Sequence, residues 1–454
     1  MKFIMNIFIY LLLLFNILSC FSKDVEINNK YSNNLIVSSI TELNNKIKSA
    51  HPGDTIILKN GIYRDAKLVL HARGEENKPI IVQAENPGKV FIEGNSSMRV
   101  GGQYVEIHGL TFREGYGRNV WEFRSKTGML ANNCRITNCI IDGYNNPDDK
   151  EEERWVLLYG KNNRIDHCTF IGKENEGVLM AVILEETKGD NESRMMNSDN
   201  YHKIDHNYFG KRPKLKYVDN GGEIIRIGDS FTSQLSSRTI VENNVFEQCD
   251  GEVEIISVKS CDNILRNNFF IESSGALVLR HGHRNLIQNN VFIGNGKRNT
   301  AGVRVINSGH VIKNNYFVQL NGKGSYSAFS VMNALEDPKA NEYHIVKDVL
   351  IEDNVFIECE NITFNLRHSD PDRAVLQIVR PQNVKFQGNI FFNKKQQLNF
   401  VFLDGEKGIE GFIFKDNVIN TNVINNLDGF SIDEEMSEPA TPGITFQYGV
   451  NYKI

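Results

Sequence analysis

The chain has 454 residues, a formal net charge of −5 and 40% hydrophobic residues, which is ample for a buried core. Ordinary globular folds of this length usually divide into two or more domains, whereas solenoids escape that limit because each repeat packs only on its neighbours. The mild acidity argues against a nucleic-acid partner, since phosphate-binding surfaces usually carry a basic excess, but it leaves room for an acidic sugar in a locally basic cleft.

The first 20 residues have the pattern of an export signal. A positive start at Lys2 precedes an apolar run over residues 7–14, which is too short to span a bilayer. Residues 17–20 (ILSC) are similar to a bacterial lipoprotein box and predict a lipid anchor on Cys20; the alternative is a plain secretory signal with an incidental cysteine. Both predict export, to the outer membrane or to the periplasm or medium, with residues 21–37 as a tether.

Residues 38–65 have the features expected of the entrance to a solenoid. Residues 41–49 could form one short amphipathic helix, and a Pro-Gly-Asp turn at 52–54 leads into an apolar strand at 55–58. The first coil of a solenoid would otherwise expose both its core and a strand edge, so a cap is needed there.

One short pattern then recurs through the chain. It consists of an apolar residue, two polar residues, a position that is usually Asn, then a β-branched or aromatic residue, and finally Phe. The spacings from Phe246 to Phe317 are 24, 22 and 25 residues, and wider spacings elsewhere fit coils with inserted loops. The aligned aromatic residues are Phe170, Phe209, Phe246, Phe270, Phe292, Phe317, Phe356 and Phe391.

A repeat of this length indicates a solenoid. The units are β-branched and aromatic without a helical period, and the spacing of leucine-rich repeats is absent. We therefore predict an all-β fold, a single-domain right-handed parallel β-helix over residues 38–454 with a short N-terminal capping helix. The recurring Asn should tolerate left-handed backbone and form an amide ladder between coils, and the recurring Phe should stack inside.

Six cysteines follow residue 20, and export would permit disulfides between them. Cys249 and Cys359 occupy the same place in their repeats, which is typical of a small buried residue in a stack. We predict mostly free, buried thiols. The six are Cys134, Cys139, Cys168, Cys249, Cys261 and Cys359.

Cationic side chains recur at coil spacing in the middle of the chain. Arg280 lies 21 residues after Lys259, and Arg304 lies 24 residues after Arg280. Apolar neighbours should turn inward and leave these three facing out as a basic column, with Arg226 and His281 close by. Stacked cations about 4.8 Å apart repel one another, so the column predicts an anionic ligand, while the alternative is a set of splayed, solvated side chains.

Oxygen ligands lie beside this column. Residues 223–228 and 254–259 align as successive coils in which two adjacent apolar residues predict a bulge. Glu252 and Glu254 then share one face, and with the amide oxygen of Asn220 they form a hard-oxygen set suited to calcium. A carboxylate pair could also be the acid and base of a glycoside hydrolase, which the neighbouring Lys and Arg disfavour.

These segments resemble polysaccharide lyase family six, the family of alginate lyases and chondroitinase B. The resemblance is carried by residues 220–228, 250–260, 279–282 and 299–306 and extends over most of the chain. It implies that Lys259 is the Brønsted base, that Arg280 is its acid partner, and that Asn220, Glu252 and Glu254 bind calcium. Val258 stands where some members carry Asn.

The implied reaction is calcium-assisted β-elimination on a uronate-containing glycan, with Arg226, His281 and Arg304 binding substrate. Alginate is the expected substrate and dermatan sulfate the alternative, with the protein acting as a monomer. Two further readings stay open: a β-helix glycoside hydrolase, and a non-catalytic glycan-binding lipoprotein. An unsaturated product would separate the lyase from both.

Overall fold

The computed structural model describes residues 34–445, apart from residues 126, 149, 186–189, 191, 193–196, 218–219, 396 and 422–426. The predicted signal, Cys20 and most of the predicted tether lie outside these ranges. In the part that is described, no helix is both long and apolar enough to cross a membrane.

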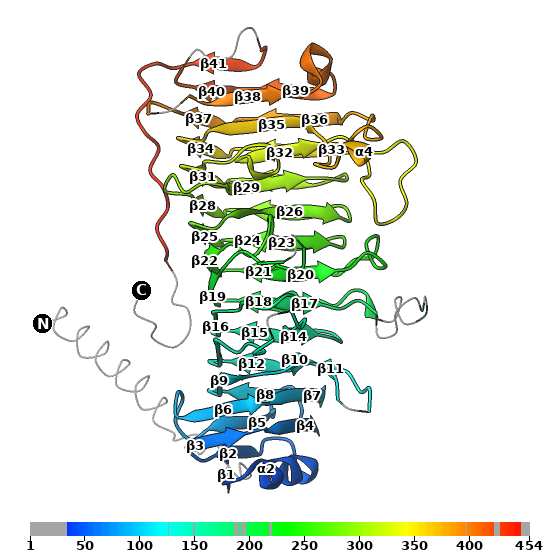
Figure 1. Cartoon of the computed structure of the whole chain (residues 1–454), viewed down its shortest axis with the longest axis vertical. Helices are drawn as coiled ribbons and strands as arrows, with labels where there is room; N and C mark the ends of the chain where they lie inside the picture. Colours follow the sequence, from blue (N-terminus) through cyan, green and yellow to red (C-terminus); the bar gives the residue numbers. More distant parts are fainter. Residues whose placement is uncertain are drawn as a thin grey trace, which may run out of the picture.

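The chain winds into a tall stack of coils whose strands form three long parallel sheets (Figure 1). The first sheet runs from β1 (Asn34–Val37) to β39 (Phe412–Lys415), and the third runs from β3 (Gly61–Arg64) to β41 (Phe430–Ile432). The second sheet carries the functional site described below. Its strands include β17 (Met180–Val182), β20 (Ile225–Gly228), β23 (Glu254–Lys259), β26 (Gly275–His281), β29 (Thr300–Val305), β32 (Phe329–Met332), β35 (Asn361–Leu366) and β38 (Asn399–Phe402).

The entrance to the stack is capped as the sequence predicts. Helix α2 (Ile40–Lys46) starts after Ser39, whose hydroxyl accepts a hydrogen bond from the backbone of Glu42, and it buries Leu43. A 3₁₀ turn at Ile47–Ser49 and strand β2 (Thr55–Leu58) follow. Strand β1 pairs with β2, so regular structure already includes Asn34, four residues before the boundary expected from the sequence.

The recurring phenylalanines form the predicted stack. Phe246, Phe270 and Phe292 lie face to face with ring centroids 4.7 and 4.5 Å apart, because strands β22 (Val245–Cys249), β25 (Phe269–Ile271) and β28 (Val291–Ile293) pair in register. The stack continues through every aligned Phe from Phe170 to Phe391. A one-dimensional repeat of large apolar rings therefore fills the interior along the axis.

The recurring asparagines form the predicted ladder. The left-handed backbone and the amide ladder, both expected of one asparagine, belong to two neighbouring positions. The amide of Asn268 donates to Asn290 Oδ1 at 2.9 Å and to the carbonyl of Val241 at 2.9 Å, while its own Oδ1 accepts from Asn244. The left-handed residue is the preceding one, such as Asn267 with a φ of 56°. One asparagine turns the corner and the next ties the coils together.

Asn268→Ala should lower the melting temperature by several degrees. The side chain is fully buried, and its removal leaves the backbone N–H of Asn244 without the acceptor that Asn268 Oδ1 provides. An unsatisfied buried polar group costs about 1–3 kcal/mol. Thermal unfolding followed by circular dichroism tests this, with the exposed Asn86→Ala as control. Equal melting temperatures for the two variants would show that the ladder does not stabilise the stack.

All six described cysteines are buried and free, which confirms the prediction of unpaired thiols. Burial raises the pKa of the Cys249 thiol, and the same holds for Cys359 at the matching place in its coil. Neutral buried thiols behave as small apolar side chains, so these residues fill space in the core.

Candidate active site

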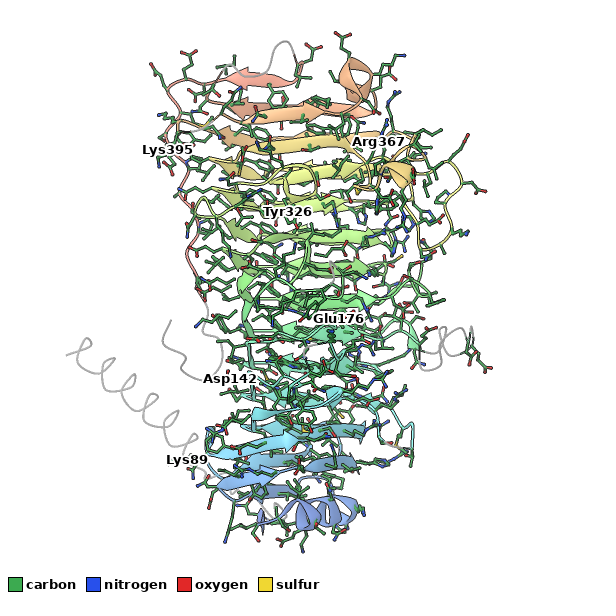
Figure 2. The ribbon with its side chains drawn as sticks, in the orientation of Figure 1. Lys89, Asp142, Glu176, Tyr326, Arg367 and Lys395 are labelled. Carbon is green, nitrogen blue, oxygen red and sulfur yellow. The ribbon has the colours of Figure 1, made fainter. Side chains whose placement is uncertain are left out.

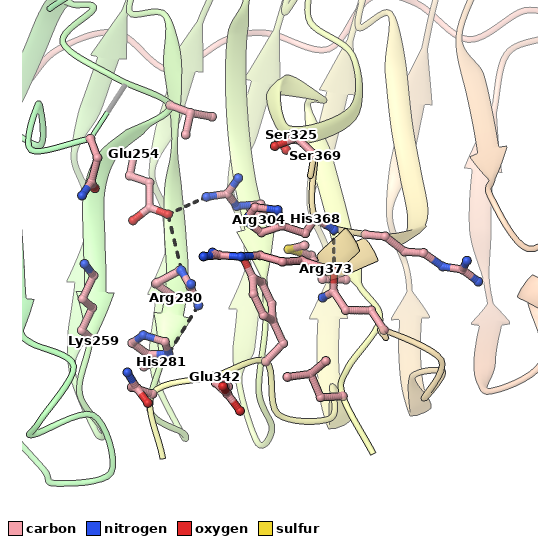
Figure 3. Close-up of a pocket in the computed structure, with 18 of the residues that line it drawn as sticks. Glu254, Lys259, Arg280, His281, Arg304, Ser325, Glu342, His368, Ser369 and Arg373 are labelled. Atoms are coloured by element: carbon pink, nitrogen blue, oxygen red, sulfur yellow. Dashed lines mark hydrogen bonds and ion pairs between the residues drawn. The ribbon is translucent and has the colours of Figure 1, made fainter. Parts of the chain in front are cut away.

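A cleft of about 890 Å³ lies on the outer face of the second sheet. Strands β23, β26, β29 and β32 form its floor, and Figure 3 labels side chains of the first three: Glu254, Lys259, Arg280, His281 and Arg304. Two excursions wall it: the loop over residues 333–346, which contributes Glu342 and Tyr343, and the segment around α4 (Pro371–Ala374), which contributes Arg373. Figure 2 shows Tyr326 and Arg367, two further lining residues, on the upper part of the stack.

Strands β20 and β23 align as the sequence predicts. Ile225 pairs with Ile256, and Gly228 pairs with Lys259. The two adjacent isoleucines of each segment, Ile224–Ile225 and Ile255–Ile256, all enter the core. The register between β23 and β26 shifts between Glu254 and Ile256, which is the irregularity expected at that pair. This bulge leaves Glu254 on the outer face, where it lines the cleft together with Lys259.

The predicted single column of cations is wrong in its register. A second irregularity in β26 places Lys259 opposite His281 rather than Arg280, and Arg304 pairs with Val278. Lys259, Arg280 and Arg304 all line the cleft, but they are offset along their strands. One extra residue in a strand re-aims the side chains around it, so spacing along the chain alone could not reveal the offset.

Arg304 and Arg280 converge on Glu254 instead of standing free. Arg304 Nη2 lies 2.7 Å from Glu254 Oε1, and Arg280 Nε lies 3.8 Å from the same oxygen (Figure 3). The other oxygen of Glu254 accepts from the hydroxyl of Ser257. Burial alone would raise the pKa of Glu254, but Arg304, Lys259 and Arg280 hold it below its ordinary value. The carboxylate is therefore ionised and neutralises the predicted mutual repulsion of the cations.

Glu252, unlike Glu254, favours its protonated form. Burial, together with the negative charges of Glu223 and Glu254, raises the pKa of Glu252 to about 9. Its Oε1 and the Oε2 of the buried Glu223 have no hydrogen-bond partner among the described residues. Two carboxylates with bare buried oxygens side by side are unfavourable unless a proton or a cation joins them.

Glu223 is a residue whose role sequence reasoning missed. It lies 3.7 Å from Lys259 Nζ and is only 2% exposed. Ile225 pairs with Ile256 in the next coil. Two residues earlier in each segment, Glu223 therefore occupies the same place in its coil as Glu254 does in the next. That match was the signal available in the sequence.

Arg280 is held from two sides. Its guanidinium stacks over the ring of Tyr343 at 4.4 Å, and its Nη1 lies 3.5 Å from His281 Nδ1. Burial and the charges of Arg280 and Lys259 lower the pKa of His281 to about 2, so the imidazole is neutral and can accept from Arg280. His281 lines the cleft but is 2% exposed, which places it behind Arg280 more than in contact with a ligand.

Of the other residues expected at the site, Asn220 lines the cleft and Arg226 does not. Asn220 is exposed and lines the cleft beside Glu252 and Glu254. Arg226 is in register with Ser257, one coil before it, and does not line the cleft. No pattern in the sequence indicated Arg367 and Arg373, the cations around α4, although both line the cleft. Burial and the charge of Arg373 lower the pKa of His368.

A calcium ion expected at Asn220, Glu252 and Glu254 can be tested against these contacts. Within the described ranges no three His, Cys, Asp or Glu side chains are gathered at metal-binding distances. The donor chemistry nevertheless fits, because Glu252 and Glu223 carry bare buried oxygens and Asn220 adds an amide oxygen. Glu254 is tied to Arg304 and Ser257 and has fewer lone pairs to offer.

A right-handed parallel β-helix with lysine, arginine and clustered carboxylates in a cleft of one sheet is the architecture of a β-helical polysaccharide lyase. The chain belongs to the chondroitinase B family, polysaccharide lyase family 6: the chondroitinase B family profile matches residues 37–441. Among curated proteins no similar sequence is found.

Solved structures of family members are similar over most of the chain. The PL6 family alginate lyase AlyGC is 40% identical with a TM-score of 0.82, over 93% of this chain and 57% of AlyGC. A mannuronic acid specific family 6 lyase from human gut microbiota is 36% identical with a TM-score of 0.75, over 89% of this chain and 88% of that one. The PL6 lyase Pedsa3628 from Pseudopedobacter saltans is 25% identical with a TM-score of 0.71, over 93% of this chain and 100% of that one. The chain thus spans little more than half the length of AlyGC.

Proposed function

We propose that the protein is a polysaccharide lyase that cleaves alginate by calcium-assisted β-elimination. The observation that carries the proposal is the placement of Lys259 and Arg280 in one cleft beside the acidic group Glu223, Glu252 and Glu254. A uronate brings one acidic proton, one carboxylate and one leaving oxygen, and this cleft offers a group for each.

In the proposed reaction, Lys259 in its neutral form takes the proton from C5 of the uronate ring. The electron pair forms the C4–C5 double bond, the C4–oxygen bond breaks, and the departing oxygen takes a proton from Arg280 or from water. Arg280, oriented by Tyr343 and His281, lies where it can stabilise the departing oxygen. The products are one chain with a new reducing end and one with an unsaturated non-reducing sugar.

A bound calcium ion would neutralise the uronate carboxylate and so make the C5 proton more acidic. Asn220, Glu252 and Glu254 would hold it, with Glu223 as an added ligand because its Oε2 is bare. Arg304 keeps Glu254 ionised and in place.

Alginate is proposed as the substrate because two solved structures that are 40% and 36% identical to this chain are named as an alginate lyase and a mannuronic acid specific lyase. Dermatan sulfate is the alternative that the family name suggests. A rise in ultraviolet absorbance from the new double bond, measured on polymannuronate, polyguluronate, mixed alginate and dermatan sulfate, tests both. Cleavage without that absorbance would instead indicate a hydrolase, for which Glu252 and Glu254 form an acid–base pair. Binding without cleavage would indicate a glycan-binding protein.

Removing calcium should lower the lyase rate by an order of magnitude or more, and added calcium should restore it. Glu252→Gln should raise the calcium concentration needed for half-maximal rate, because it removes one ligand charge from a hard-cation site. The rate is measured in chelator-treated protein titrated with calcium. Full activity in extensively chelated protein would show that an arginine of the cleft, and not calcium, neutralises the carboxylate.

We also propose that the protein is exported, acts as a monomer and is anchored by a lipid on Cys20. The lipoprotein-like sequence at residues 17–20 supports the export and the lipid anchor. Metabolic labelling with a fatty acid tests it: label should enter the wild type and not Cys20→Ala. An unlabelled, exported wild type would point to the plain secretory signal.

A further inference from the structure

A buried arginine lies directly beneath the acidic side of the cleft. Arg212 ends strand β19 (Tyr208–Arg212), is 1% exposed, and makes no ion pair with a carboxylate at hydrogen-bond distance among the described residues. A guanidinium buried without a carboxylate partner is costly unless its donors are satisfied elsewhere. Its partners therefore show what it is there to hold.

Those partners are backbone carbonyls from two successive corner loops. Nη1 of Arg212 donates to the carbonyl of Glu223 at 2.7 Å, and Nη2 donates to that of Gly221 at 3.1 Å. Nη2 also donates to Gly177 at 2.9 Å and Asn175 at 3.4 Å in the preceding coil. The planar fork of one arginine thus joins the segment that carries Asn220 and Glu223 to the body of the helix.

The surrounding backbone is shaped around this side chain. A Cβ on Gly251 would lie 2.9 Å from Arg212 Nε and 2.3 Å from the carbonyl oxygen of Gly222. Gly251 directly precedes Glu252, so the two glycines let the segments bearing Glu223 and Glu252 close over the guanidinium.

The charge of Arg212 also reaches the carboxylates. Burial lowers the pKa of Arg212 to about 10, and Glu223 and Glu252 act in the opposite direction. Arg212 and Lys259 are the two cations that oppose the rise in the pKa of Glu252, one from below and one from inside the cleft.

We infer that Arg212 is a positioning residue for the acidic side of the cleft, which fixes the backbone of residues 221–223 and so places Asn220 and Glu223 for a cation. The inference rests on the proposed calcium site but makes a claim of its own about the segment. Arg212 does not line the cleft, so it would act through the residues that it holds.

The chain offers a matched control in Lys173. It is also fully buried, and its Nζ donates to the carbonyls of Asn175 at 2.9 Å and Glu176 at 3.3 Å. It therefore shares one partner with Arg212 but does not reach residues 221–223. Lys173→Met should lower the melting temperature without changing the acidic side of the cleft.

The test compares Arg212→Met, Arg212→Lys and Lys173→Met. Calcium alone is titrated by calorimetry, and amide hydrogen exchange is measured for a peptide that covers residues 220–224. Arg212→Met should weaken calcium binding at least tenfold and speed exchange in that peptide. Arg212→Lys, which keeps the charge but loses the fork, should fall between, and it substitutes for Arg212→Met if that variant does not fold. Lys173→Met should bind calcium within threefold of the wild type.

Two results would overturn the inference. One is unchanged exchange at residues 220–224 in a folded Arg212 variant, and the other is an equal loss of calcium binding in Lys173→Met. If the wild type bound no calcium, the proposed function would lose its metal, but the exchange measurement would still decide whether Arg212 holds the segment.

Discussion

Lys259→Ala should abolish lyase turnover while leaving the fold intact. Lys259 lines the cleft at the end of β23, and its side chain is 17% exposed, so truncation opens no cavity in the apolar core. A general base contributes about 10²–10⁴-fold to a rate, and no other lysine lines this cleft among the described residues. The loss should therefore fall on kcat, with KM changed little.

Lys313→Ala is the matched control, since Lys313 lies on the first sheet in β30 (Val311–Lys313), away from the cleft. Both variants should show the circular dichroism of the wild type. Lys313→Ala should keep the wild-type melting temperature, whereas Lys259→Ala should lower it by a few degrees, because the buried Glu223 loses its ion-pair partner. Product formation is followed by ultraviolet absorbance on the glycan that the wild type cleaves. A Lys259→Ala protein with wild-type kcat would contradict the mechanism and move the search for the base to another group of the cleft.

The fold could be predicted because its information is local and repeated. Each Phe of the stack and each Asn of the ladder stands in the same short pattern, and parallel pairing places identical positions above one another. An error in one coil would have been exposed by its neighbours. The capping helix could likewise be predicted, because its apolar face and its Ser39 cap lie within a few residues.

The site could be predicted only in part, because its geometry depends on irregularities. The bulge in β26 adds one residue beside Arg280, and nothing in the spacing from Lys259 to Arg280 distinguishes that residue from an ordinary coil position. The role of Glu223 was missed because its carboxylate meets Glu252 from the preceding coil, outside the Glu-x-Glu pattern.

The walls of the cleft lie still further from any local signal. The hydroxyl of Ser233 holds the loop over residues 333–346 by donating to the carbonyl of Ala340 at 2.7 Å, a contact that spans 107 residues. Tyr343, carried by the same loop, then lies against Arg280. Sequence reasoning could place Lys259 and Arg280, the proposed catalytic pair, but not the loop that orients Arg280.

Arg304→Ala should lower kcat as well as raise KM. The sequence predicts that Arg304 faces out and binds substrate away from the scissile bond, and on that basis its removal would raise KM several-fold with a smaller loss in kcat. The structure gives it a different contact: it is 7% exposed and pairs with Glu254 at 2.7 Å. Removing one partner of a buried ion pair costs about 3–5 kcal/mol, because the other charge is left uncompensated.

The loss should appear in two measurements. The melting temperature should fall, because the cost of the unpaired charge is a loss of folding stability. Separately, kcat/KM should fall by about two orders of magnitude, which at 1.36 kcal/mol per tenfold is about 2.7 kcal/mol of lost transition-state stabilisation. Arg298→Ala is the control, because Arg298 is exposed and precedes β29 on the same coil.

A double-mutant cycle with Glu254→Gln separates the two roles that Arg304 could have. If Arg304 acts through Glu254, the double variant should lose little more than either single variant, since the pair is already broken. If Arg304 binds a sugar carboxylate directly, the two losses should add, and added salt should imitate the Arg304→Ala effect on KM in the wild type. We expect the losses of the two single variants to be strongly non-additive and insensitive to salt. Arg304 and Glu254 both lie on the floor of the cleft, and their side chains are largely buried from solvent.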